Sequence, residues 1–397
     1  MIIAVAIEKW NLHKRIALNV ISFFGTTPSR IVLGFMVATA FISMWINNTA
    51  TTLMVMPIGL AVLLKVEESF GKENSEPFSK TILLGIAYAS SIGGIATLIG
   101  TAPNMVFQRV YNISFPNSEG IHFGEWMKYA LPISLTMLIF TWFLLTKVIF
   151  KISNKLEIDK AIIEEERKKL GKFSYEEKVI SLIFLITSLL WIFRVDLNLE
   201  WIIIPGWSKI FHKFDFIDDA TIAIAMATIL FIIPAKNGDS SNSFLLNHNS
   251  LKKIPWDIII LFGGGFAIAD GFVSSGLSKL IGVKLAVLSG TNIVLLILIV
   301  CFSVTALSEI ASNTATAQII LPILASISIQ MNINPMVLMI PATLAASFGF
   351  MLPVGTPPNA IVFGSERLRV IDMAKSGVLI DIVSVLVITL FTCIFFL

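Results

Sequence analysis

The chain has 397 residues, of which 56% are hydrophobic and 14% are charged, with a formal net charge of +3 at pH 7. This composition excludes an ordinary soluble domain and indicates a polytopic membrane protein, in agreement with a mean hydropathy of +0.85. The basic residues form no stripe, so nothing in the sequence supports a nucleic-acid partner. Two isolated cysteines and four scattered histidines provide neither a disulfide framework nor the spacing of metal ligands.

Residues 1–30 begin with a short apolar segment. Residues 1–8 are too few to span a hydrocarbon core, which needs roughly 20 helical residues, and they lack the charged leader and cleavage site of a signal peptide. We interpret them as the end of a membrane span. The following residues mix basic side chains with spaced apolar ones, a pattern typical of a helix that lies in the membrane interface.

Residues 31–66 are apolar except for a central polar cluster of Asn47, Asn48 and Thr49. As one helix, about 35 residues would run near 50 Å, which is too long for one crossing, and each arm alone is too short. We therefore predict a re-entrant hairpin whose tip carries the polar cluster into the membrane, buried in protein. Two short but complete spans are the alternative.

Residues 80–150 hold two further predicted spans, which follow a polar loop. The first span, residues 81–110, is interrupted by glycines and by the sequence GTAPN at residues 100–104, so we predict a helix broken in its middle. Residues 129–150 form an ordinary span. Residues 151–178 form a loop with eight Lys and Arg residues, which the positive-inside rule places in the cytoplasm.

The second half of the chain repeats this order after a set of scaffold spans. Residues 291–330 are again an apolar run of awkward length with a polar cluster inside it, Ser312 to Thr314, and we predict a second re-entrant hairpin. The remaining predicted segments are scaffold spans at 179–194, 218–234 and 256–274 within residues 179–290, an interfacial helix before residue 290, and, within residues 335–397, a span broken at GTPPN (residues 336–363) and a closing span (residues 377–397).

Two phrases occur twice in the chain. NNTATTLMVMPI at residues 47–58 matches SNTATAQIILPI at 312–323, and GTAPN matches GTPPN, so the chain contains an internal repeat. An odd number of predicted crossings separates the hairpins, which makes the repeats inverted, as in transporters with alternating access. The predicted fold class is an all-α polytopic membrane protein with inverted repeats, two re-entrant helical hairpins and two broken transmembrane helices. Because three spans precede the second hairpin and only a stub precedes the first, we expect the chain to lack N-terminal helices.

The matched interruptions favour one shared binding site. Helix N-termini that meet at one depth attract an anion, and the phrases contain no Lys or Arg, so neutral donors would hold it. Asn and Ser/Thr oxygens with freed backbone carbonyls suit a small alkali cation, which makes sodium coupling a hypothesis. The alternative is that these residues are only interhelical hydrogen-bonding groups and kinks. Glu309 is either a proton or cation site or a local structural partner, and its counterpart in the first half is Met44.

Four segments resemble the signatures of the divalent-anion/sodium symporter family, the di- and tricarboxylate carriers. They are SMWINNTATTLMVMPIG, GGIATLIGTAPN, SEIASNTATAQIILPI and FMLPVGTPPNAIVFG, and AIEKWNLHKRIAL resembles the segment before the first hairpin in that family. The resemblance implies a multi-pass transporter of the plasma membrane, not an enzyme, that works as a homodimer. It also implies an elevator motion, in which a transport domain with both tips slides against a scaffold domain.

The resemblance also implies the ligands of the site. Family members usually have Ser at the position of Asn47, and they carry further scaffold helices before the first hairpin. The implied substrate-binding residues are Asn48, Thr49, Thr101, Asn313, Thr314, Thr356 and Pro357. The implied sodium ligands are Ser43, Asn47, Asn48 and Gly100 for one ion, and Ser308, Ala311, Asn313 and Gly355 for the other.

The expected function is sodium-coupled import of C4-dicarboxylates such as succinate, malate or fumarate. Within the same family, a sodium-independent dicarboxylate exchanger and a sulfate carrier are the alternatives. A membrane enzyme would need paired carboxylates or clustered histidines at the site, and the sequence shows none. The last alternative is an inactive membrane remnant, because the first repeat is short. No organic cofactor is expected, and the partners are a small dianion, sodium and the lipid bilayer.

Overall fold

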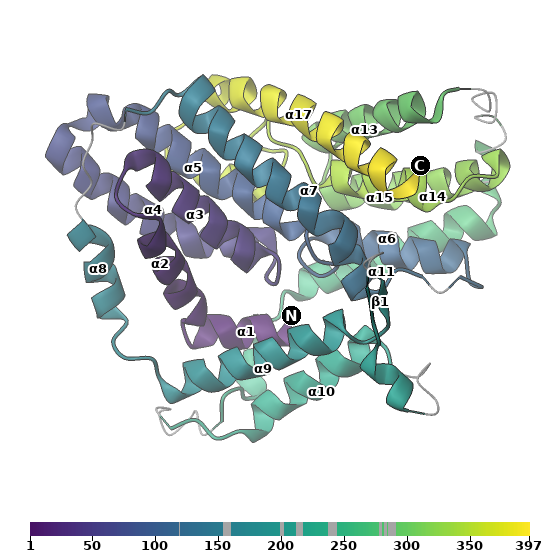
Figure 1. Cartoon of the computed structure of the whole chain (residues 1–397), viewed down its shortest axis with the longest axis horizontal. Coiled ribbons are helices and arrows are strands. Elements are labelled where there is room, and N and C mark those ends of the chain that lie inside the picture. The colour runs from purple at the N-terminus through teal and green to yellow at the C-terminus, as the bar shows by residue number, and fades with distance from the viewer. Residues whose placement is uncertain are drawn as a thin grey trace.

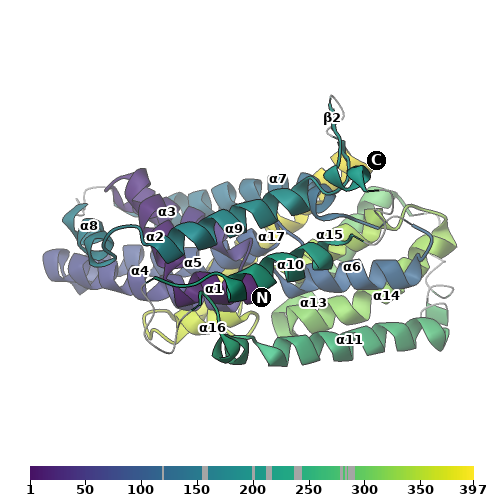
Figure 2. The same cartoon turned by 90° about the horizontal axis from the view of Figure 1, so that it is seen from below.

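The computed structural model describes residues 1–118, 120–153, 160–198, 202–211, 217–236, 244–277, 280–281, 284 and 291–397. Nearly all regular structure in these residues is helical, which confirms the predicted all-α class. The predicted interfacial helix before residue 290 lies largely outside the described residues. Figure 1 shows the helices running mostly along the long axis of the molecule. Figure 2, the view from below, shows that they lie over one another in more than one layer.

The first half of the chain forms the helices up to the basic loop. They are α1 (Ile2–Lys9), α2 (Leu12–Phe24), α3 (Pro28–Ser43), α4 (Asn48–Phe70), α5 (Lys72–Gly94), α6 (Ala102–Ser114), α7 (Phe123–Phe143), the π-helix η1 (Leu144–Ile149) and α8 (Lys160–Lys169).

The second half forms the remaining elements. They are α9 (Tyr175–Ile192), β1 (Leu197–Asn198), β2 (Ile203–Ile204), the 3-10 helix η2 (Trp207–Ile210), α10 (Asp219–Ile232), the 3-10 helix η4 (His248–Lys253), α11 (Trp256–Ser274), α13 (Ile293–Ile310), α14 (Asn313–Met331), α15 (Met336–Ala346), α16 (Pro357–Phe363) and α17 (Val370–Phe396).

Helix ends follow local capping chemistry more closely than hydropathy. Ser174 begins α9 with a capping box, because its Oγ accepts from the Glu177 N–H at 3.1 Å and its own N–H donates to Glu177 Oε2 at 2.8 Å. The predicted polar loop after residue 66 is wrong: α4 continues to Phe70, and Gly71 alone, at φ +81°, joins it to α5. Hydropathy marks the membrane boundary, whereas a helix continues past it until a residue such as glycine permits a turn.

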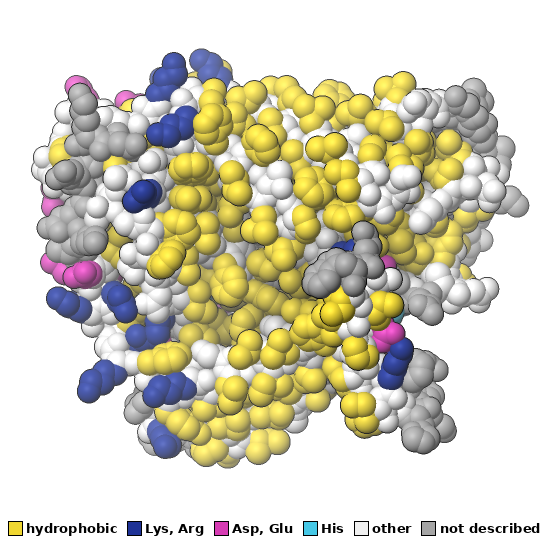
Figure 3. Space-filling view, in the orientation of Figure 1, with side chains coloured by type: hydrophobic (Ala, Val, Ile, Leu, Met, Phe, Trp, Pro, Cys, Tyr) yellow, Lys and Arg dark blue, Asp and Glu magenta, His cyan; other side chains and the backbone are white. Residues whose placement is uncertain are grey.

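Five helices in the described residues are long and apolar enough to cross a membrane. They are Asn48–Phe70, Phe123–Ile149, Ile293–Ile310, Asn313–Met331 and Val370–Phe396. Figure 3 shows hydrophobic side chains over most of the face in view, while most Lys and Arg side chains gather toward the end where α8 lies. This distribution agrees with a cytoplasmic basic end.

The helices of the two halves pack in the same order. In the first half α3 and α4 both pack against α5, and in the second half α13 and α14 both pack against α15. The long helix α7 covers α3 and α5, as α17 covers α13 and α15, and these two long helices also contact each other. The second segment of each broken helix packs against the other half of the chain: α6 packs on α14, and α16 packs on α4. The re-entrant depth of the helix pairs stays a prediction.

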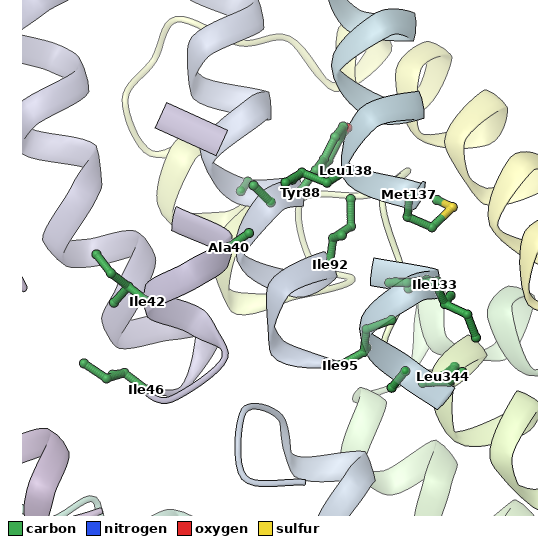
Figure 4. Packing of buried hydrophobic residues seen from close by; sticks show 14 of the residues in the cluster. Ala40, Ile42, Ile46, Tyr88, Ile92, Ile95, Ile133, Met137, Leu138 and Leu344 are labelled. Carbon is green, nitrogen blue, oxygen red and sulfur yellow. The ribbon is translucent and has the colours of Figure 1, made fainter. Parts of the chain in front are cut away.

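The core between α3, α5 and α7 depends on a close backbone approach. Figure 4 shows Tyr88 and Ile92 of α5 among buried side chains of α3 and α7, including Ala40 and Met137. A Cβ added to Gly93 of α5 would lie 2.2 Å from the carbonyl oxygen of Ala40. Only glycine therefore lets α3 lie this close to α5 just before both helices end.

We expect Gly93→Ala to lower the melting temperature of the purified protein in detergent, because the added methyl group overpacks the contact at a cost of about 1–3 kcal/mol. Gly263→Ala in α11 is the matched control, since a Cβ there meets nothing within 4 Å. The control should be neutral or slightly stabilising, because alanine favours helix. Equal melting temperatures for the two variants would contradict the described packing.

Candidate functional site

The first polar cluster lies at the turn between α3 and α4. Asn47 is the N-cap of α4, and its Oδ1 accepts from the Ala50 N–H at 2.8 Å. The Ser43 hydroxyl, at the end of α3, lies 2.8 Å from Asn48 Oδ1 and 2.6 Å from the carbonyl oxygen of Ser90 in α5. A hydroxyl has one proton, so three oxygens here share a single hydrogen and lone pairs remain on the acceptors.

The first break, between α5 and α6, is held by one asparagine. The Nδ2 of Asn104 donates toward the carbonyl oxygens of Thr97 at 2.7 Å and of Gly94 and Ile95 at 3.3 Å. The Thr97 hydroxyl donates to the carbonyl oxygen of Met44 in the adjacent turn. The break is thus fixed internally and also attached to the tip of its own half.

The second half builds the same arrangement from its own residues. The Ser308 hydroxyl lies 2.7 Å from both Asn313 Oδ1 and the carbonyl oxygen of Ala346. The Nδ2 of Asn359 donates to the carbonyl oxygens of Gly349 and Leu352, each at 3.0 Å. The internal repeat of the sequence is therefore a repeat of hydrogen-bond geometry.

The two halves differ in how the tip is attached to the break. In the second half the Glu309 carboxylate accepts from the N–H groups of Met351 at 2.9 Å and Leu352 at 3.1 Å. This supports the structural-partner interpretation of Glu309, which occupies the position of Met44 in the first half. Asp381 of α17 is also buried and lies close enough to Glu309 for the two carboxyl groups to interact. The second half therefore has an acidic residue, Glu309, on its tip where the first half has Met44.

Glycines let oxygen atoms approach the broken helices. A Cβ on Gly94 would lie 2.3 Å from Asn48 Oδ1, and one on Gly100 would lie 2.4 Å from the Gly94 carbonyl oxygen and 2.9 Å from that of Ser43. A Cβ on Gly355 would lie 3.1 Å from Glu309 Oε2 and 3.3 Å from the Gly349 carbonyl oxygen. Each tip and its break therefore enclose a small region rich in oxygen.

The structure groups most of the expected ligands by half. Ser43, Asn48 and Gly100 lie together in the first half, and Ser308, Asn313 and Gly355 lie on the matching tip and break of the second. Of the others, the N-caps Thr101 and Thr356 are buried, Thr314 is buried, Thr49 is half-buried, and Ala311 and Pro357 are exposed. The Asn47 oxygen is already used as a helix cap.

Asn104 and Asn359 were not among the residues predicted for the site. The signal was present, because each is the last residue of a repeated GTxPN phrase. Their role could not be inferred from sequence, since the carbonyl groups that they contact belong to the break itself.

A cavity of about 620 Å³ lies between α2, α4 and α8, beside the first tip. Ala50, in the first turn of α4, is part of its lining. Burial lowers the pKa of His13, another lining residue, below its usual value, so its ring is neutral at neutral pH. The charged residues of the lining are Glu8, Lys14, Glu166 and Lys169.

Known proteins resemble this chain over nearly its whole length. Residues 1–396 match the family described as the sodium:sulfate symporter transmembrane region. The chain is 40% identical over 394 residues to the sodium-dependent dicarboxylate transporter SdcS of Staphylococcus saprophyticus, covering 98% of this chain and 73% of that protein. The transporter of the same name from Staphylococcus aureus strain NCTC 8325 is 41% identical, again over 98% of this chain and 73% of that protein.

A solved structure shares the fold. The crystal structure of the YdaH transporter of Alcanivorax borkumensis superposes with a TM-score of 0.60 and 12% sequence identity, over 99% of this chain and 84% of that one. At this identity the likeness supports the polytopic helical fold alone. The family match and the curated relatives confirm the resemblance that the repeated phrases indicated. The chain therefore belongs to the sodium:sulfate symporter family, and it is a multi-pass transporter of the plasma membrane, not an enzyme.

Proposed function

We propose that this protein is a sodium-coupled symporter that imports C4-dicarboxylates such as succinate, malate or fumarate. The observation that carries the proposal is the matched pair of oxygen-rich regions at Ser43–Asn48 and Ser308–Asn313, one at each tip. The relatives from Staphylococcus, which are named sodium-dependent dicarboxylate transporters, support the same function.

Sodium fits the geometry of each tip. Hard cations prefer oxygen ligands, and each region offers a hydroxyl, an amide oxygen and backbone carbonyls that share too few protons to use all their lone pairs. In the proposed site one sodium ion binds Ser43, Asn47, Asn48 and Gly100, and another binds Ser308, Ala311, Asn313 and Gly355. Because the Asn47 Oδ1 already caps α4, it has one remaining lone pair for the ion.

The dicarboxylate would be held by neutral donors from both halves. Sodium bound to Asn48 Oδ1 and Asn313 Oδ1 leaves the amide N–H groups of these residues free to face a carboxylate. The hydroxyl groups of Thr49 and Thr314, in the first turn of α4 and α14, add donors at helix N-termini. Thr101, Thr356 and Pro357 begin α6 and α16 and complete the proposed set. Because no Lys or Arg of the repeated phrases holds the dicarboxylate, the substrate can be released when the sodium ions leave.

Charge balance explains the coupling. A dianion in a region of low dielectric constant is repelled by neighbouring carboxyl groups such as Glu309 unless cations offset its charge. Sodium at each tip supplies that charge and shares Asn48 and Asn313 with the substrate. Binding of either partner therefore favours binding of the other.

We infer an elevator motion in a homodimer, as the family resemblance implies. The mutual packing of α3–α7 with α13–α17 supports one transport domain, whereas the most extensive contact of α9 is with α10. The cavity between α2, α4 and α8 borders the proposed transport domain through α4, next to the first tip.

Uptake of labelled succinate into proteoliposomes tests the proposal. With an inward sodium gradient we expect accumulation, and with choline in place of sodium we expect none, because the sodium ions neutralise the dianion. Unlabelled sulfate should compete weakly and fumarate strongly. Uptake that ignores sodium but requires internal dicarboxylate would instead identify an exchanger, and strong competition by sulfate would identify a sulfate carrier.

We expect Asn48→Ala and Asn313→Ala each to abolish sodium-dependent uptake while membrane insertion persists, since each removes a sodium ligand and a substrate donor together. Asn292→Ala is the control, because this asparagine caps α13 through the N–H groups of Val294 and Leu295, away from the tip. The control should lose about 1 kcal/mol of stability and keep uptake. Wild-type uptake in either tip variant would refute the assignment.

A further inference from the structure

Asn104 and Asn359 share a feature that their hydrogen bonds do not explain. Both are completely buried, at 0% exposure. Each Nδ2 has backbone carbonyl partners in the break, but in the described part of the chain neither Oδ1 accepts a hydrogen bond. These two atoms occupy matching positions of the two repeats.

The orientation of each amide is fixed by its surroundings. Asn104 faces the carbonyl oxygens of Gly94, Ile95 and Thr97, and Asn359 faces those of Gly349 and Leu352. A flipped amide would point its oxygen at these carbonyls, which accept but do not donate. The Oδ1 atoms must therefore face away from the carbonyls they hold.

A buried amide oxygen without a partner costs about 1–3 kcal/mol. One unpartnered amide oxygen could have many causes. The same unpartnered oxygen at matching positions of both repeats indicates that the two asparagines have the same role. The carbonyl groups that these asparagines hold lie beside the tips, since Gly94 is in contact with Asn48 Oδ1 and Gly349 lies against the carbonyl oxygen of Ser308. Each of the two asparagines is therefore anchored to backbone that borders one of the oxygen-rich regions.

We propose that Asn104 and Asn359 are sodium ligands, whose Oδ1 atoms enter the coordination shell of the ion at the first and second tip respectively. Amide oxygens are hard neutral ligands of the kind that small cations use. The Nδ2 of the same residue fixes the broken helix, so one side chain both positions the break and contacts the ion. This inference rests on the proposed sodium coupling and adds two residues that the motif resemblance does not supply.

Sodium-dependent thermal stability provides the test without transport. The melting temperature of the full chain in detergent is measured while sodium chloride replaces choline chloride at constant ionic strength, with no dicarboxylate present. An ion that binds only the folded protein raises the melting temperature with its concentration. In Asn104→Leu and Asn359→Leu we expect the sodium concentration for half-maximal stabilisation to rise about tenfold or more, the range seen when support of a metal site is removed.

Two sets of variants separate a ligand from a structural amide. Asn104→Asp and Asn359→Asp keep the oxygen, and their protonated forms keep one donor, so the sodium midpoint should stay near that of the wild type. Thr81→Val and Thr343→Val remove buried hydroxyls that donate to Pro77 and Met339 within α5 and α15. These controls should lower the melting temperature in choline and leave the sodium midpoint unchanged.

The outcomes discriminate between the two proposals. An unchanged sodium midpoint in the leucine variants, or equal loss in the leucine and aspartate variants, would overturn the ligand assignment. A wild-type protein that sodium does not stabilise would overturn the proposed sodium coupling itself. If a leucine variant does not fold, the serine variant at that position replaces it, since serine withdraws the oxygen from the ion yet leaves a polar group, and the same criteria apply.

Discussion

The structure depends on how a polypeptide breaks a helix where no water is available. Each interruption frees backbone N–H and carbonyl groups, and in an apolar environment every such group left without a partner is costly. This chain supplies the partners from a few side chains. Ser43 and Ser308 attach each tip to the helix beside it, and Asn104 and Asn359 hold the carbonyls of each break. The polar groups that make the proposed binding site are therefore the same groups that stabilise the broken helices.

The two halves solve one geometric problem with different chemistry. Thr97 donates its hydroxyl to the backbone of Met44, so in the first half the break reaches the tip. Glu309 accepts from the backbone of Met351 and Leu352, so in the second half the tip reaches the break. Each half therefore joins its tip to its break by hydrogen bonds, but the side chain comes from the break in the first half and from the tip in the second. The second version leaves a carboxylate next to the proposed cation, which makes the electrostatics of the two tips unequal although their shapes correspond.

Much of this arrangement could be predicted from the sequence, because the repeated segments have nearly the same amino acids at matching positions. The apolar runs, the interrupting phrases and the family signatures predicted an all-α membrane transporter, and the comparisons confirmed it. Hydropathy failed at the end of α4, where it predicted a loop, since a helix continues through polar residues until Gly71. The hydrogen bonds of Asn104 and Asn359 could not be predicted, because their partners are backbone carbonyl groups, which leave no signature in the sequence. The packing of α6 on α14 was equally invisible, since residues far apart in sequence meet only in the fold.

The packing of each broken helix against the other half has a consequence for biosynthesis. The ribosome completes α6 long before α14 exists, and α16 is made near the end of synthesis although it packs on α4, one of the earlier helices. The first half therefore enters the membrane with one of its packing surfaces uncovered, and lipid or the insertion machinery must cover that surface until the second hairpin is made. Neither repeat is a self-sufficient folding unit.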